Sequence, residues 1–341
     1  VPITIKDNYK TKGLRTTSGY KPLTNNVPDT DAEIVKLLIS EGAIIIGKTN
    51  LSVLAMDMQS DNPIFGKTNN PWDTTKTSGG SSGGCATALA TGMTPLSFGN
   101  DVAGSIRIPA AYCGLYGFKP SFGAVSLHGI QTDPKEKVNG LKTLAVAGPL
   151  ARNIDDLELA MSIIAKTTSE DRRLTPLVKN TDTIDIRNLK IAWTDEFGGV
   201  PVDNEIKLKI QEYISKLEKA GATVVKVTPE IDFNLAWKTW GSFIGMQGGY
   251  NTSNFVKWMG LPFIKGVLKD VPMHQNVVKP TSVEKYMIAM NIQDSMINTM
   301  ENFMNEYDAF ICPVSAVTAF NHHAPSKSYG SFSLYNTPLK V

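Results

Sequence analysis

Apolar and polar residues follow two periods along this chain, one typical of short buried strands and one typical of amphipathic helices. Strand-like runs occur at Val1–Ile5, Ala43–Ile46, Thr94–Phe98, Leu189–Thr194, Ala222–Val227 and Ala309–Val314. Helical runs lie between them at Asp29–Glu41, Gly83–Thr91, Asn153–Ala165, Asp203–Ala220 and Ser282–Glu306. Because the two kinds of element alternate, the pattern predicts an α/β sheet covered by helices on both faces.

Residues at the ends of some helical runs support these boundaries. Gly42 follows the first run, and glycine commonly ends a helix. Asn153 is the predicted N-cap of another helix, and Asp155 and Asp156 follow it in the first turn, where they suit the helix dipole.

Other segments carry a weaker pattern. Asn50–Met58 is predicted to form a short helix. Leu235–Met273 is aromatic and glycine-rich without clear periodicity, so we expect short helices and a wall of the substrate pocket there. The helix at Ser282–Glu306 carries spaced methionines, which favour flexible core filling over a cofactor site; they are Met287, Met290, Met296, Met300 and Met304.

Composition places the chain among ordinary globular proteins. Of 341 residues, 42% are hydrophobic and 19% charged, and the formal net charge is +2. That charge gives no electrostatic reason to expect a nucleic acid or an anionic membrane as partner. Three cysteines are too few and odd in number for a disulfide framework, which favours a reducing compartment, and no apolar run is long enough to span a membrane.

The two ends of the chain look truncated, because it opens on a strand without an initiator methionine and stops just after a loop containing proline. No repeat or linker interrupts it. We therefore predict a single domain over residues 1–341, with the candidate chemistry in 1–155 and the rest of the sheet, helices and pocket wall in 156–341.

Candidate chemistry rests on two serines in glycine-rich turns. Ser105 lies where a strand runs through a turn into a helix that begins near Ile106–Ala110, and Ser81 lies 24 positions earlier. A serine nucleophile needs a base and donors for the developing oxyanion. The backbone N–H groups of Val102, Ala103, Gly104 and Ser105 are the candidate oxyanion donors. The alternative is that Ser105 only caps a helix.

Ser81 has glycines on both sides, so unusual backbone dihedral angles are available around it. A flexible linker is a poor alternative because ordered elements follow at once, and a phosphate-binding loop lacks its Gly-Lys-Ser/Thr ending. Asp101 and Arg107 bracket the Ser105 turn, and we expect them to pair and hold it rigid.

Lys6 could supply the base if burial lowers its pKa and leaves the amine neutral. Two alternatives remain open for this residue: a surface lysine at a strand end, or a charged lysine paired with Asp7. Competing schemes are weaker. The histidines His128, His274, His322 and His323 lack metal-ligand or nucleophile-elbow spacing, and Cys113 is typical of a buried core thiol. We expect no metal and no cofactor.

The order of these motifs resembles the amidase signature family. Agreement is dense over residues 1–155 and looser beyond them. It rests on Val1–Asn8, Gly47–Asn50, Asn62–Pro63, Asn70–Trp72, Gly79–Gly84, Gly99–Ala110, Cys113–Gly114, Gly117–Pro120, Ala147–Arg152 and Tyr307–Pro313.

The resemblance implies the amidase signature fold, in which a central mixed β-sheet has helices on both faces. It also implies a triad of Ser105 as nucleophile, Ser81 as bridging serine after a cis peptide bond supported by Gly80, and Lys6 as base. Residues beside the substrate would then be Ala55, Met56 and Asp57. Asn100 and Ala103 depart from the family's usual threonine and glycine in this loop.

We therefore expect an amide hydrolase that cleaves a linear carboxamide through a seryl acyl-enzyme in the cytoplasm. Its expected partner is a small-molecule amide, without nucleic acid or membrane, and a homodimer is allowed. One alternative is a glutaminase-type subunit of a tRNA-dependent amidotransferase that supplies ammonia to a partner. A binding protein without catalysis is the third possibility, and the intact triad positions argue against it.

Overall fold

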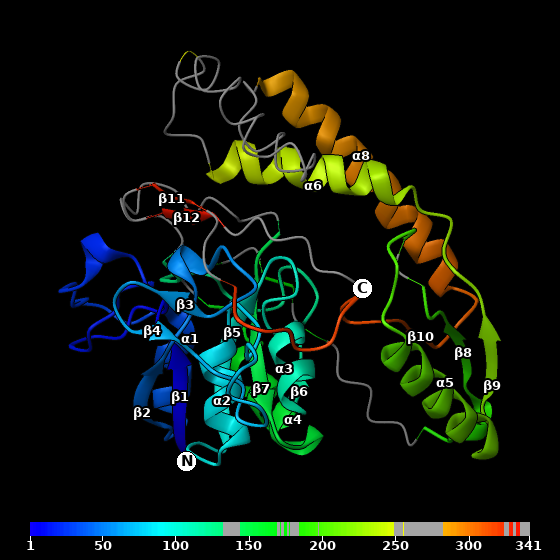
Figure 1. Cartoon of the computed structure of the whole chain (residues 1–341), viewed down its shortest axis with the longest axis horizontal. Helices are drawn as coiled ribbons and strands as arrows, with labels where there is room; N and C mark the ends of the chain where they lie inside the picture. Colours follow the sequence, from blue (N-terminus) through cyan, green and yellow to red (C-terminus); the bar gives the residue numbers. More distant parts are fainter. Residues whose placement is uncertain are drawn as a thin grey trace. The chain divides into compact units, whose positions relative to one another are not determined.

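The chain divides into two compact units in the computed structural model (Figure 1). The first comprises Val1–Lys179 and Ala319–Thr337, and the second Asn180–Thr318 and Pro338–Val341. The structure describes residues 1–131, 144–168, 171, 174–175, 177, 184–196, 198–248, 255, 282–323, 327–329 and 332–334. A single domain over 1–341 stays a prediction.

A five-stranded mixed sheet forms the centre of the first unit, in the order β2-β1-β5-β7-β6. Its strands are β1 (Pro2–Lys6), β2 (Ile44–Thr49), β5 (Leu96–Asp101), β6 (Tyr116–Gly117) and β7 (Val146–Ala151). Strands β2, β1 and β5 are parallel, whereas β7 is antiparallel to β5 and to β6. The predicted mixed sheet is therefore confirmed.

Parallel pairing brings two distant segments to one edge of this sheet. Ile5 of β1 pairs with Phe98 of β5, so the chain leaves both strands on the same side. Lys6 at the end of β1 therefore lies beside the turn that follows β5, although 94 positions separate it from Asn100. The figure shows these strands as neighbours (Figure 1).

Helices pack on both faces of the sheet. They are α1 (Glu33–Ser40), α2 (Gly83–Ala90), α3 (Arg107–Cys113) and α4 (Ile154–Ile164). Alternate residues of a strand point to opposite faces. Accordingly, Ala147 and Ala151 of β7 share a buried cluster with α1 and α4, while Leu150 between them packs with α2 and α3. Asn153 caps α4 as predicted, because its side chain accepts from the Asp156 N–H at 2.8 Å.

Smaller elements complete the described part of this unit. They are the 3₁₀ turns η1 (Lys21–Leu23) and η2 (Val53–Ala55), the pair β3 (Asp61–Asn62) and β4 (Gly66–Lys67), and the pair β11 (Lys327–Tyr329) and β12 (Phe332–Leu334). The chain returns to the first unit late: Thr77 N–H donates to Phe320 O, and Lys76 forms a β-bridge with Asn321.

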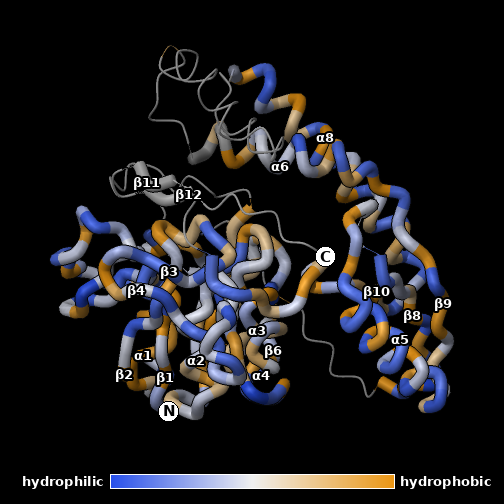
Figure 2. Tube along the Cα trace, viewed as in Figure 1, coloured by the Kyte–Doolittle hydropathy of each residue, from blue (hydrophilic) through white to orange (hydrophobic). Residues whose placement is uncertain are grey.

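A parallel sheet of order β10-β8-β9 builds the second unit. Its elements are η3 (Ile186–Asn188), β8 (Lys190–Trp193), α5 (Asn204–Lys219), β9 (Thr223–Lys226), α6 (Phe233–Gly248), α8 (Val283–Met304) and β10 (Ala309–Ile311). Apolar and polar residues alternate along α5 in Figure 2, as its amphipathic sequence predicts. In α8, Met290, Met296, Met300 and Met304 are half-buried and Met287 is exposed, so the core-filling interpretation holds only in part.

Two segments differ from the sequence expectation. The helix expected at Asn50–Met58 is only the turn η2, because Leu54 and Ala55 take positive φ angles of 51° and 60° that no α-helix accommodates. Between Phe233 and Gly248 the chain forms one 16-residue helix rather than short helices. Of the rest of the Leu235–Met273 segment, beyond Gly248, the structure describes only Phe255. His274 lies outside the described residues.

Among the residues that the structure describes, no helix combines the length and the hydropathy that crossing a membrane requires.

Candidate active site

Lys6 is fully buried and hydrogen-bonded to side chains of two neighbouring segments. Its Nζ donates to Ser81 Oγ at 2.7 Å and to Asn100 Oδ1 at 2.6 Å. Burial lowers the pKa of Lys6 to about 7, because the charged ammonium loses its hydration, although electrostatic interactions with Cys85 and Asp101 act in the opposite direction. The alternative of a surface lysine is therefore wrong, and a large fraction of this amine is neutral near pH 7.

Asp7 does not pair with Lys6. Its Oδ2 accepts from the Thr17 hydroxyl at 2.5 Å and from the Thr17 N–H at 3.1 Å. Burial raises the pKa of this carboxyl, and the hydrogen bonds of Thr17 and the charge of Lys48 offset only part of the effect. Lys6 thus keeps two neutral partners, and its second alternative also fails.

Ser81 follows a cis peptide bond with Gly80 and is fully buried. Ser60 fastens the surrounding turn: its Oγ lies 3.1 Å from the carbonyl oxygens of Gly79 and Ser81 and accepts from the Gly83 N–H at 2.8 Å. A Cβ at Gly80 would lie 2.6 to 2.8 Å from backbone atoms of residues 57–59. Only glycine fits at that position without moving the backbone it touches.

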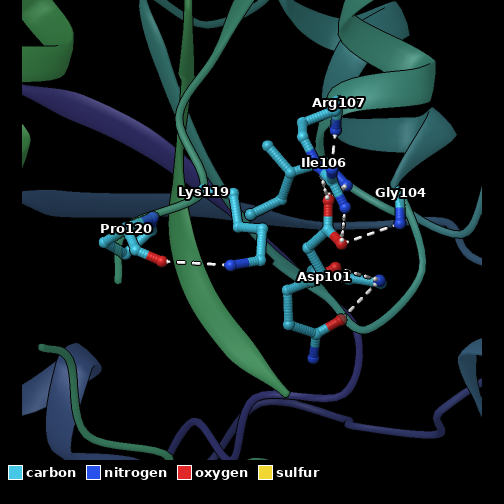
Figure 3. A network of polar contacts seen from close by, with 8 residues as sticks. Asp101, Gly104, Ile106, Arg107, Lys119 and Pro120 are labelled. Atoms are coloured by element: carbon cyan, nitrogen blue, oxygen red, sulfur yellow. Dashed lines mark hydrogen bonds and ion pairs between the residues drawn. The ribbon is translucent and has the colours of Figure 1, made fainter. Parts of the chain in front are cut away.

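Asp101 lies at the end of β5 and organises the loop that carries Ser105 (Figure 3). Its carboxylate accepts from the N–H groups of Gly104 at 2.7 Å and Ile106 at 3.1 Å, and it forms two side-chain hydrogen bonds with Arg107 at 2.9 and 3.0 Å. Burial by itself raises the pKa of Asp101, but the hydrogen bonds and charge of Arg107 outweigh it and hold the pKa below its usual value. The predicted pair is present and ties both sides of the loop.

These contacts change the predicted set of oxyanion donors. The Gly104 N–H is already used by Asp101 Oδ1, so it is not available to an oxyanion. The N–H groups of Val102, Ala103 and Ser105 make no hydrogen bond to any described residue. They are the remaining candidates, and they lie in the loop that carries the Ser105 side chain.

Ser105 and Ser81 line one pocket in the first unit. The other residues of its wall are Asn8, Leu54, Ala55, Asn100, Val102, Leu127, Ile130 and Ala145. Ser105 is 9% exposed, and its hydroxyl makes no hydrogen bond to that of Ser81, both serines being described residues. The pocket wall therefore combines Ser105, the candidate nucleophile, and Ser81, the candidate bridging serine, with mainly apolar residues.

Of the residues predicted to touch the substrate, only Ala55 reaches this pocket. Met56 is 54% exposed, and Asp57 is not part of the described pocket wall. The Asp57 carboxylate accepts from the Met58 N–H at 2.7 Å, and burial raises its pKa to about 6. Positive φ angles at Leu54 and Ala55 turn the chain there, which the expected helix could not do.

Three residues of the site were given no functional role from the sequence. Asn100 was noted only as a departure from the family pattern, although parallel pairing of β1 and β5 could have placed it beside Lys6. Asn8 follows Lys6 by two positions and lines the pocket. Ser60 carries no local signal, because its contacts with the Ser81 turn depend on a chain reversal that the sequence pattern does not indicate.

Comparison with known proteins gives a consistent family. The family model described as Amidase matches residues 1–340. The A subunit of glutamyl-tRNA(Gln) amidotransferase from Halothermothrix orenii is 32% identical over 347 residues, which cover 94% of this chain and 70% of that protein. The chain covers between 46% and 70% of the length of such curated relatives.

Solved structures agree with the fold. The A subunit of glutamyl-tRNA(Gln) amidotransferase from Thermotoga maritima superposes with a TM-score of 0.77 at 27% identity, over 94% of this chain and 69% of that one. Fatty acid amide hydrolase superposes with a TM-score of 0.79 at 26% identity, over 94% of this chain and 56% of that one.

The names of these relatives correct the expected partners. We predicted a small-molecule amide, no nucleic acid and, at most, a homodimer. The curated relatives and the Thermotoga maritima structure named above are A subunits of an amidotransferase that is named for a tRNA. The partner prediction is therefore wrong, since it left out both a different protein chain and a nucleic-acid-linked substrate.

Proposed function

This chain belongs to the amidase family, and from that premise we propose that it is a glutaminase-type subunit that releases ammonia for a partner acting on glutamyl-tRNA. The observation that carries the proposal is the buried Lys6–Ser81 hydrogen bond of 2.7 Å beside a pocket that Ser105 lines. In this arrangement Lys6 would be the neutral base, Ser81 the hydroxyl relay and Ser105 the nucleophile, and no histidine is needed.

In the proposed mechanism Ser105 Oγ attacks the carbonyl carbon of the carboxamide. Ser81 takes the proton of that hydroxyl and passes its own proton to the neutral Lys6 amine. The backbone N–H groups of Val102, Ala103 and Ser105 stabilise the oxyanion. Free enzymes often hold such hydroxyls apart until substrate binds, and we expect the Ser105–Ser81 contact to form at that stage.

Collapse of the tetrahedral intermediate breaks the C–N bond. The proton held by Lys6 returns through Ser81 to the leaving nitrogen, which departs as ammonia. Water then attacks the acyl group on Ser105 with the same serine and lysine as base, and releases the acid. Asn100 Oδ1 accepts a hydrogen bond from the lysine throughout, which keeps Nζ directed at the relay.

One observation favours the glutaminase-type subunit over a free-standing amidase. Curated relatives that match most of this chain are repeatedly named as the A subunit of glutamyl-tRNA(Gln) amidotransferase. The similarity to Fatty acid amide hydrolase, together with a mainly apolar pocket wall, keeps a free-standing amide hydrolase as the second candidate. The two functions share the chemistry at Ser105 and differ in the acyl group and in the need for a partner.

A measurement of ammonia release distinguishes the glutaminase-type subunit from the free-standing amide hydrolase. The full-length protein is incubated with glutamine and with aryl and aliphatic primary amides, each with and without its partner proteins and glutamyl-tRNA. We expect turnover of glutamine, enhanced by the partners, and its loss in Ser105→Ala. Comparable turnover of aryl or aliphatic amides without partners supports the free-standing hydrolase, and unchanged turnover in Ser105→Ala removes Ser105 from the mechanism.

A further inference from the structure

The side chain of Asn8, which lines the pocket, carries a buried carboxamide without a hydrogen-bond partner among the described residues. The residue is 1% exposed, and neither its Oδ1 nor its Nδ2 makes a hydrogen bond to a described residue. Buried polar groups are almost always hydrogen-bonded, and an unpaired one destabilises the folded protein. Such a group in a folded protein therefore needs an explanation, and a functional role in the pocket that it lines is one.

The main chain holds Asn8 firmly in this place. Its carbonyl accepts from the Gln131 N–H at 2.7 Å, and the flanking residues are fixed by hydrogen bonds from Asp7 N–H to Thr49 O and from Tyr9 N–H to Lys6 O, both at 3.1 Å. The unpaired amide is therefore a fixed feature of the pocket, two residues from Lys6.

Polar atoms in the described pocket wall are few, and most already have a role. Ser81 and the Asn100 oxygen are bonded to Lys6, and Ser105 carries the attacking hydroxyl. A bound primary carboxamide also brings two N–H bonds into a pocket whose other described walls are apolar. Among the described side chains of this wall, Asn8 Oδ1 is a buried acceptor without a hydrogen-bond partner, so it can receive one of them.

We propose that Asn8 is a specificity-determining residue that binds the leaving nitrogen and selects primary carboxamides. Its Oδ1 accepts one N–H of the substrate –CO–NH₂, and the bond strengthens as that nitrogen gains a proton and becomes a cationic donor. An ester has no N–H at the leaving atom and gains nothing from Asn8. This inference rests on the proposed amide hydrolysis at Ser105.

The test compares glutamine with glutamate γ-methyl ester, since both yield glutamate and the same assay follows both. In Asn8→Leu, which is similar in size and apolar, we expect kcat/KM to fall about 10- to 100-fold for the amide and by less than about threefold for the ester. Ile130→Val is the matched control in the same wall, and it should change both reactions by the same factor.

Stability gives an independent readout. Because Asn8→Leu removes an unpaired buried amide, its melting temperature should equal or exceed that of the wild type. A large decrease in melting temperature with equal loss on both substrates would assign Asn8 a structural role and overturn the proposal. If Asn8→Leu does not fold, Asn8→Ala must show the same change in the amide-to-ester ratio.

The result that contradicts the proposed function differs from the result that contradicts the role of Asn8. A wild type that does not cleave glutamine but cleaves another primary amide contradicts the glutaminase proposal, and Asn8 is then tested on that amide and its methyl ester. An unchanged amide-to-ester ratio in an active Asn8→Leu variant contradicts only the inference on Asn8.

Discussion

A single buried lysine sets the expected pH behaviour of this site. The proposed mechanism needs Lys6 neutral, and burial lowers its pKa to about 7. We therefore expect kcat/KM to rise with pH through about 7 and to level off above it, where the amine is deprotonated. Lys6→Met should lower kcat/KM by about 100-fold or more, which is the usual contribution of a general base.

Lys48 is the control, because it is a half-buried lysine that binds Tyr9 O and the Thr11 hydroxyl rather than the serines. Burial lowers the pKa of Lys48 to about 8. The midpoint of the rate profile should stay near the Lys6 pKa of about 7 in Lys48→Met. A midpoint that disappears in Lys48→Met and persists in Lys6→Met would reverse the assignment of the base.

The same pKa shift predicts an effect on stability. In the unfolded chain Lys6 titrates near 10.5, and in the folded protein near 7. Because the folded state binds the proton less tightly, the lysine destabilises the protein fully below pH 7 and progressively less as pH rises from 7 to 10.5. Lys6→Met should raise the free energy of unfolding most at neutral or lower pH, measured by urea titration at several pH values. A gain that grows with increasing pH would contradict this.

At the scale of the element, the loop between β5 and α3 depends on one carboxylate. Asp101→Asn removes a charge that binds two backbone N–H groups and Arg107. We expect a loss of about 1–3 kcal/mol in the free energy of unfolding, because buried N–H donors lose their anionic acceptor, whereas the Arg107 side chain is 45% exposed and is partly screened by water. Activity should fall as well, since the loop positions Ser105.

The exposed pair of Arg187 and Asp185, whose N–O distance is 2.6 Å, is the control for this variant. Water and salt screen exposed pairs, so Asp185→Asn should leave the melting temperature unchanged. Equal changes in the two variants would mean that burial of Asp101 carries no special weight.

Close packing between two loops makes a separate prediction at Gly80. A side chain at Gly80 would meet the backbone of residues 57–59, which cannot move as a flexible side chain can. Gly80→Ala should lower the free energy of unfolding by about 1–3 kcal/mol and reduce turnover, because it shifts Ser81. Gly47→Ala is the control, since no heavy atom lies within 4 Å of its added Cβ. Thermal unfolding and turnover of both variants decide the matter.

Elements with a clear period were predictable from sequence, and those shaped by tertiary contacts were not. The helix α5 and the strands around it follow from local periodicity and a glycine stop. At Leu54 and Ala55 the chain instead takes positive φ angles, which no local signal in these two residues indicates. The segment of α6 was predicted only as short helices, although Phe233, Trp237 and Trp240 have the i, i+4, i+7 spacing of one helix face.

The candidate site divides in the same way. Lys6, Ser81 and Ser105 carry chemistry that a motif can reveal, whereas the unpaired amide of Asn8 becomes visible only when its surroundings are known. Use of the Gly104 N–H by Asp101 likewise depends on loop geometry, and it narrows the set of oxyanion donors.

At the scale of the whole molecule, each unit has its own sheet. Every strand pair in the described part of the chain joins strands of the same unit, and the buried clusters of the first unit draw on its own elements. The pocket wall also belongs entirely to the first unit.

This division predicts how the protein unfolds on heating. Calorimetry of the full chain should show two unfolding transitions. A fluorophosphonate bound covalently to Ser105 should raise the transition temperature of the first unit only, because a ligand stabilises the unit that binds it. Ser105→Ala, which cannot react, is the control and should show no shift with the reagent. One transition that moves as a whole would instead support the single domain predicted from the sequence, in which both sheets unfold cooperatively.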